Sequence, residues 1–154
     1  MNQHTVALTR VFEAPRERVF ACWTHAEHLQ HWFGPKGFTI HSCETDPRQG
    51  GVFKLCMRAP DGKDYWVRGR FRQMDFPSRL IIDCSADDEK GVEQLQEVID
   101  VTFSESGGRT TVALNAVARA RETAGPSDEA AAMLKGMDKG WAQTIDRLGT
   151  HLRR

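Results

Sequence analysis

The sequence has no net charge and no long apolar run, and each absence excludes a class of protein. Lysine plus arginine equals aspartate plus glutamate at 21 each, and no segment concentrates basic residues, so we expect no nucleic-acid partner. No stretch has the length of a membrane span, and no charged-then-apolar leader follows Met1. We therefore expect no membrane insertion and a cytoplasmic location.

The motifs of the common enzyme and metal classes are also missing. The cysteines form no C-x-x-C pair, which argues against a zinc knuckle or a thioredoxin-type centre and predicts free, mostly buried thiols. There is no G-x-S-x-G elbow, no Walker-type loop and no dinucleotide fingerprint. Hydrolase, kinase and dehydrogenase interpretations lose their usual support, and we expect no cofactor.

Three regularly spaced histidines invite a metal interpretation. His25, His28 and His31 are three residues apart, so on a helix they rotate steadily away from a common face. No acidic ligand accompanies them at a suitable spacing. We expect solvated or capping roles and no metal site.

The chain is long enough for one domain, spanning residues 1–154, with a substantial core. Thr5–Glu13 alternates as a strand, and Arg16–Trp23 and His25–Trp32 have helical spacing. Beyond Gly37 the period becomes two, and Gly- and Pro-rich turns separate the runs, which predicts an antiparallel meander. Its strands are expected around Phe38–Ile40, Phe53–Met57, Tyr65–Phe71, Leu80–Cys84, Leu95–Phe103 and Thr110–Ala118.

The last segment predicts one long amphipathic helix that begins near Gly125-Pro126-Ser127. Gly136 and Gly140 lie inside it, although each costs about 1 kcal/mol relative to alanine. They indicate either close packing of the helix on the sheet or one wall of a ligand cavity. The apolar stripe that defines the helix contains Ala130, Leu134, Met137, Trp141, Ile145, Leu148 and Leu152.

These elements predict an α+β architecture of about seven antiparallel strands. Because only one long helix is available to cover the apolar face, the sheet is expected to curl around that helix. The two short helices would close one end of the half-barrel. Such a grip favours an interior pocket with aromatic, aliphatic and methionine walls.

Six segments, in order and over nearly the whole chain, resemble the SRPBCC or START-like superfamily. The resemblance is strongest to the branch named after the homologue of the activator of the heat-shock protein ninety ATPase. Each segment is weak alone, but six in register are specific for the family. They are Ala14–Phe20, Trp32–Pro35, Asp46–Gly51, Gly69–Leu80, Val101–Phe103 and Gly136–Trp141.

The resemblance implies a helix-grip fold with a hydrophobic cavity between the curved sheet and the C-terminal helix. In related families that cavity holds lipids, sterols, polyketides, plant aromatics or reaction intermediates. The chain departs from the pattern at Trp32-Phe33, where many relatives have two tryptophans, and at Phe71, where a tyrosine is frequent. The second departure predicts that a phenolic donor inside the pocket is missing.

Strand alternation turns one carboxylate toward this pocket. Glu97 alternates with Leu95 and Ile99 on the same face of the strand, so it is expected to point inward, where desolvation would raise the pKa of its carboxyl. Alternatively, the carboxylate reaches water or pairs with an arginine. Trp32-Phe33 is expected to be either a lid or a plug at one end of the grip. The candidate cavity residues are Trp32, Phe33, Phe53, Leu55, Met57, Phe71, Glu97, Ile99, Met133, Met137 and Trp141.

Three functions remain open. The first is binding of a hydrophobic small molecule, lipid-like or aromatic and polyketide-like. The second is catalysis of the cyclase, dehydratase or aromatase type on a similar ligand. The third is a chaperone-regulating interaction, to which we give little weight because the eukaryotic activator joins such a domain to a separate N-terminal domain and none precedes Met1 in this sequence. A monomer or a homodimer is expected.

Overall fold

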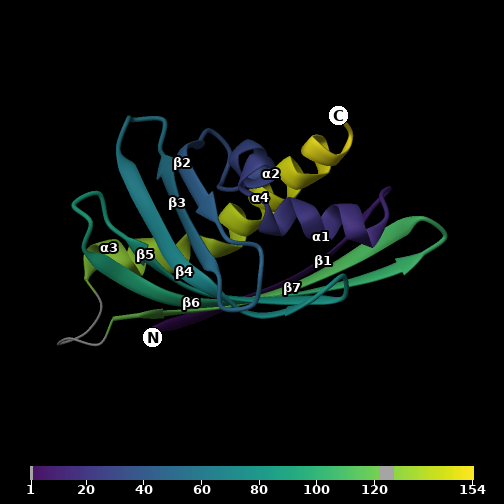
Figure 1. The fold of residues 1–154 in the computed structure, drawn as a ribbon. Coiled ribbons are helices and arrows are strands. Elements are labelled where there is room, and N and C mark those ends of the chain that lie inside the picture. Colours follow the sequence, from purple (N-terminus) through teal and green to yellow (C-terminus); the bar gives the residue numbers. More distant parts are fainter. Residues whose placement is uncertain (1, 122–126) are drawn as a thin grey trace.

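The computed structural model describes residues 2–121 and 127–154, which form an α+β fold around a seven-stranded antiparallel sheet (Figure 1). The strands lie in the order β1-β7-β6-β5-β4-β3-β2, so β2 to β7 make a meander and β1 pairs with β7. The predicted order of elements is confirmed. The strands are β1 Gln3–Phe12, β2 Thr39–Thr45, β3 Val52–Arg58, β4 Asp64–Asp75, β5 Arg79–Asp87, β6 Glu93–Ser106 and β7 Arg109–Ala120.

The sheet curves around the C-terminal helix, and the two short helices lie on the same side (Figure 1). These are α1, Arg16–Thr24, and α2, Ala26–Trp32, as predicted after the first strand. Pro15 precedes α1 in an extended conformation, and its carbonyl accepts the first helical hydrogen bonds. No helix in the described ranges is long and apolar enough to span a bilayer.

Two irregularities in β4 help the sheet to bend. The register between β4 and β5 shifts between Phe71 and Gln73, which is the effect of a β-bulge. Gly69 lies so close to β5 that a Cβ atom there would be 1.9 Å from the carbonyl oxygen of Asp83. Only glycine permits this approach of the two backbones.

The predicted long C-terminal helix is present and packs on the sheet, but a break at Gly136 separates its first two turns from the rest. The structure has α3, Asp128–Lys135, and α4, Met137–Leu152, joined at Gly136. Helix-type backbone hydrogen bonds continue on both sides of Gly136, whose low helix propensity explains why the break falls there. Ser127 caps α3, because its Oγ accepts a bond from the amide of Ala130 at 3.0 Å. The predicted start at Gly125-Pro126 lies outside the described residues.

The apolar stripe of α4 packs into the concave side of the sheet. Ile145 and Leu148 have no exposed surface, and Met137 and Trp141 are 8% exposed. The indole of Trp141 stacks on that of Trp23 from α1, with ring centroids 6.2 Å apart. The core therefore joins α1, α4 and the sheet, and leaves the N-terminal part of α4 to border a cavity.

Candidate functional site: a cavity between the sheet and α4

A cavity of about 410 Å³ lies between the sheet, the α3–α4 junction and the loop that follows α2. This size falls in the range of small-molecule sites. Ala132 and Gly136 are exposed, so the cavity reaches the surface beside that junction. The lining residues are Phe33, Gly34, Pro35, Phe38, Met57, Tyr65, Val67, Cys84, Ala86, Leu95, Glu97, Ile99, Glu129, Ala132, Met133, Gly136, Met137, Gly140, Trp141 and Thr144.

Seven of the eleven residues proposed from the sequence line this cavity. They come from the loop after α2, from β3 and β6, and from the two C-terminal helices. The set is Phe33, Met57, Glu97, Ile99, Met133, Met137 and Trp141.

The other four candidates, Trp32, Phe53, Leu55 and Phe71, lie in the packed core with no exposed surface and off the cavity wall. The Nε1 of Trp32 donates a hydrogen bond to the carbonyl of Cys22 at 3.0 Å. The ring of Phe53 packs edge-on against both Phe33 and Phe71. These side chains fill the space behind the wall, so Trp32 is a plug, whereas Phe33 reaches the cavity.

The two glycines of the C-terminal segment border open space. Both Gly136 and Gly140 line the cavity. A Cβ atom at Gly140 would come no closer than 3.8 Å to the Cγ of Pro35, which is an ordinary van der Waals contact. Close packing of backbones therefore does not explain Gly140, and the cavity-wall interpretation holds at this position.

Arg147 fixes the loop that supplies one side of the wall. Its Nη1 donates to the carbonyls of Gly34 at 2.8 Å and Pro35 at 2.9 Å, with a longer contact to Phe33 at 3.5 Å. Burial lowers the pKa of the guanidinium, which is half-buried. The sequence analysis missed this residue, because Arg147 lies more than a hundred positions from the carbonyls it binds.

Glu97 is the central polar group of the cavity. Its Oε2 accepts a hydrogen bond from the Nε1 of Trp141 at 3.1 Å. Its partners across the strands are Cys84 on β5 and Ala118 on β7, two small residues that leave room for the indole. Glu97 is half-buried, and no cation of the described chain forms an ion pair with it.

The environment of Glu97 favours its uncharged form. Burial raises the pKa of the carboxyl from 4.5 to about 7, and the hydrogen bond from Trp141 opposes this rise. The neighbouring thiol of Cys84 has its pKa raised well above the usual range, first by burial and then by the nearby charge of Glu97. A carboxyl group whose pKa is near neutral can accept or donate a proton inside an apolar cavity.

One phenol also lies on the wall. Because position 71 is a phenylalanine, the sequence predicts a pocket without a phenolic donor, but Tyr65 on β4 lines the cavity. Burial raises the pKa of Tyr65, so its hydroxyl stays protonated at neutral pH. The signal was present in the sequence, because Tyr65 and Val67 share the alternation that places Phe71 inside.

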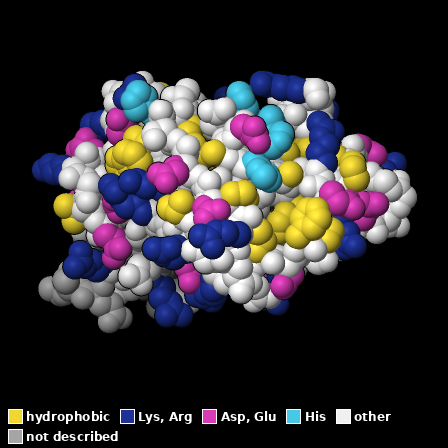
Figure 2. All heavy atoms as spheres, in the orientation of Figure 1, with side chains coloured by type: hydrophobic (Ala, Val, Ile, Leu, Met, Phe, Trp, Pro, Cys, Tyr) yellow, Lys and Arg dark blue, Asp and Glu magenta, His cyan; other side chains and the backbone are white. Residues whose placement is uncertain are grey.

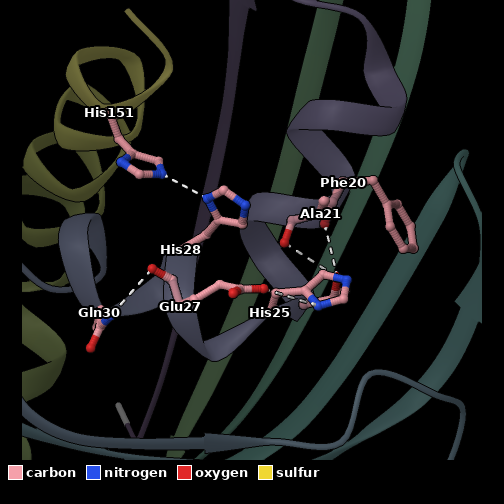
Figure 3. A network of polar contacts seen from close by, with 8 residues as sticks. Phe20, Ala21, His25, Glu27, His28, Gln30 and His151 are labelled. Atoms are coloured by element: carbon pink, nitrogen blue, oxygen red, sulfur yellow. Dashed lines mark hydrogen bonds and ion pairs between the residues drawn. The ribbon is translucent and has the colours of Figure 1, made fainter. Parts of the chain in front are cut away.

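The three histidines of α2 and its N-cap lie in different surroundings, and two of them, His28 and His31, lie against the same residue, His151. His25 lies at the start of α2, with its Nδ1 3.9 Å from Glu27. His28 turns instead toward His151 of α4 (Figure 3). The ring of His31 stacks on that of His151, with centroids 5.5 Å apart.

Comparison with known proteins places the chain in a family. The family described as Activator of Hsp90 ATPase homolog 1-like protein matches residues 13–153, so the chain belongs to it, within the SRPBCC superfamily. No protein with a curated description matches the sequence.

Solved structures have the same fold. A protein of Chromobacterium violaceum is 25% identical, with a TM-score of 0.74 over 96% of this chain and 95% of that one. A protein of Rhizobium leguminosarum is 21% identical, with a TM-score of 0.78 over 99% and 95%. The AHSA1 protein of Silicibacter pomeroyi is 21% identical, with a TM-score of 0.73 over 97% of each chain. The last two likenesses concern the fold.

Proposed function

We propose that this protein binds a hydrophobic small molecule, neutral or cationic, in the cavity between the sheet and α4. The observation that carries the proposal is an apolar cavity whose wall contains the carboxyl group of Glu97, with its pKa raised by burial. Ligand sites of proteins commonly combine an apolar enclosure with a few polar groups that fix orientation. The family fold is compatible with ligand binding.

The charge of the wall selects among ligands. The described lining contains two acidic residues, Glu97 and Glu129, and no lysine, arginine or histidine. An anionic ligand would therefore enter without a counter-charge and would face the carboxylate of Glu97. A hydroxyl or an amine can donate to Glu97, and Tyr65 and Trp141 contribute aromatic surface to the cavity wall.

The proposal is tested with three probes that share one aromatic body: naphthalenemethanol, naphthalenemethylamine and naphthoate. Calorimetric titration at pH 8 should show binding of the alcohol and the amine. The naphthoate should bind at least about tenfold more weakly, a difference of about 1.4 kcal/mol. Equal or tighter binding of naphthoate contradicts the charge argument, and no binding of any probe, together with no retained molecule in native mass spectrometry, contradicts the cavity function.

Catalysis of the cyclase, dehydratase or aromatase type is the second candidate, and one observation favours it. The pKa of Glu97 is raised to about 7, which suits a general acid or base at neutral pH. The test needs a substrate that the enzyme turns over. Glu97→Gln should then reduce turnover by roughly a hundredfold while ligand affinity stays within a few fold; an unchanged rate rejects this role.

A chaperone partner is the third candidate. Such a role would need a contiguous apolar surface. The large apolar side chains with substantial exposure in the described chain are Val11, Phe76 and Val92, which lie in three separate segments. Charged side chains of both signs are interspersed over the face drawn in Figure 2. The cavity is the stronger basis for a function.

A further inference from the structure

Away from the cavity, three helices bring a thiol and two imidazoles together. Cys22 comes from α1, His28 from α2 and His151 from the last turn of α4. One ligand atom of each lies within 4.8 Å of the others. None of the three residues lines the cavity, so this cluster is independent of the proposed ligand site.

The two imidazoles already point at each other. The Nδ1 of His28 lies 3.0 Å from the Nε2 of His151 (Figure 3). A tetrahedral zinc ion with Zn–N distances of about 2.0–2.1 Å holds its two nitrogens about 3.3 Å apart. The rings therefore need only a small separation to share an ion.

The ring of His151 is free to take the tautomer that such a site needs. Its Nδ1 is buried and has no hydrogen-bond partner among the described residues. With the proton on Nδ1, the lone pair of Nε2, which faces the Nδ1 of His28, is left for an ion.

Cys22 supplies the third donor from the interior. Its side chain is 1% exposed, and burial raises the pKa of the thiol to about 11, partly offset by the charge of Arg18. The thiol is therefore protonated when no ion is present. Coordination breaks the S–H bond: the proton goes to solvent, and the sulfur electron pair forms the bond to the ion.

We propose that Cys22, His28 and His151 form a binding site for a thiophilic divalent cation, zinc in the first instance, with water as the fourth ligand. One thiolate with two imidazoles is a donor set that suits zinc and not magnesium or calcium. His28 and His151 are both half-buried, so an ion and its water can reach the site from the surface. Histidine side chains gather on the face in Figure 2, on the side of the molecule where α2 and α4 lie in Figure 1.

The site went unnoticed in the sequence for a physical reason. Of the three spaced histidines only His28 takes part, and its partner His151 lies 123 positions further along the chain. The thiol belongs to a third helix. Such a set becomes visible only when α1, α2 and α4 have packed together.

Cobalt is the probe that tests the site, because a cobalt–thiolate bond gives a charge-transfer absorption band. The chain is stripped with a chelator and titrated with Co²⁺, and zinc is then added in competition. We expect one equivalent of Co²⁺ to bind with a thiolate band, and zinc to displace it. Cys22→Ser should abolish the band, and Cys43→Ser, which alters a half-buried thiol elsewhere, should keep it.

A second comparison does not depend on how Cys22→Ser folds. His28→Gln and His25→Gln change neighbouring histidines of the same helix region, only one of which belongs to the cluster. His28→Gln should weaken Co²⁺ affinity by roughly a hundredfold or more, and remove the rise in Tm that zinc gives the wild type. His25→Gln should leave both unchanged. Equal effects of the two substitutions, or Co²⁺ binding without a thiolate band, overturn the proposal.

Discussion

The Nε1 of Trp141 donates a hydrogen bond to the Oε2 of Glu97 over 3.1 Å, and so joins α4 to the first half of β6 at the cavity wall. This bond favours the charged form of the carboxyl, whereas burial disfavours it. Burial is the larger of the two effects, which is why the pKa of Glu97 is raised to about 7. A change in either the burial or this hydrogen bond should therefore shift the pKa of Glu97.

Trp141→Phe should raise the pKa of Glu97 further. Phenylalanine keeps an aromatic ring in the core but cannot donate, so the bond that lowers the pKa is lost while the burial remains. The titration can be followed by carbon-13 NMR of the Glu97 carboxyl. Trp66→Phe, which changes a half-buried ring packed against Lys54 and Arg68, is the control. A lower pKa in Trp141→Phe would contradict the assignment of this bond.

Glu97→Gln should remove a pH dependence of stability. The pKa in the folded state is raised above the ordinary value of 4.5, so between pH 4.5 and about 7 the folded protein binds more protons than the unfolded one. The carboxyl therefore reduces the free energy of unfolding as pH rises through this window, by about 3 kcal/mol at most. The variant, which cannot ionise, should be more stable than the wild type above pH 7.

Urea unfolding at pH 4.5, 6 and 8 measures this effect as the difference between wild type and variant. Glu44→Gln, at an exposed position on β2, controls for the removal of a surface charge. A difference between wild type and Glu97→Gln that stays constant across the three pH values would show that Glu97 ionises at its ordinary pKa.

Arg147→Met should loosen the loop that carries Phe33. The methionine keeps much of the aliphatic contact but leaves the carbonyls of Gly34 and Pro35 without their donor. Loss of hydrogen bonds from a charged donor should reduce the free energy of unfolding by about 2 kcal/mol. Chemical denaturation provides the measurement, with the exposed Arg153→Met as the control. Equal stabilities of the two variants would mean that the loop does not depend on Arg147.

Much of the fold could be predicted from local patterns. Alternation along Leu95, Glu97 and Ile99 gave the inward face of β6, and the stripe around Trp141 gave the buried face of α4. The division of the C-terminal helix was missed, although Gly136 itself was recognised as unfavourable within a helix. A continuous apolar stripe does not reveal whether the backbone bends at one residue.

The candidate site was predicted less completely than the fold. Alternation along a strand predicts which face of the sheet a side chain lies on, but not whether that position is beside the cavity or in the packed core. Phe53 and Met57 both lie on β3, yet only Met57 reaches the cavity wall. Whether an inward ring fills the core or borders the cavity depends on which side chains cover it, as Phe33 and Phe71 pack against Phe53. Contacts between distant segments, such as that of Arg147 with Pro35, have no local signal at all.

Occlusion of the cavity tests the central claim most directly. Leucine at position 140 would project from α4 into the cavity beside Pro35, whereas Lys139→Leu places the same side chain at an exposed position one residue earlier. Calorimetric titration with naphthalenemethanol is carried out on both variants and the wild type, with circular dichroism to verify folding. The account predicts that folded Gly140→Leu loses at least about tenfold in affinity while Lys139→Leu binds like the wild type. Wild-type affinity in folded Gly140→Leu would contradict the claim that this cavity is the ligand site.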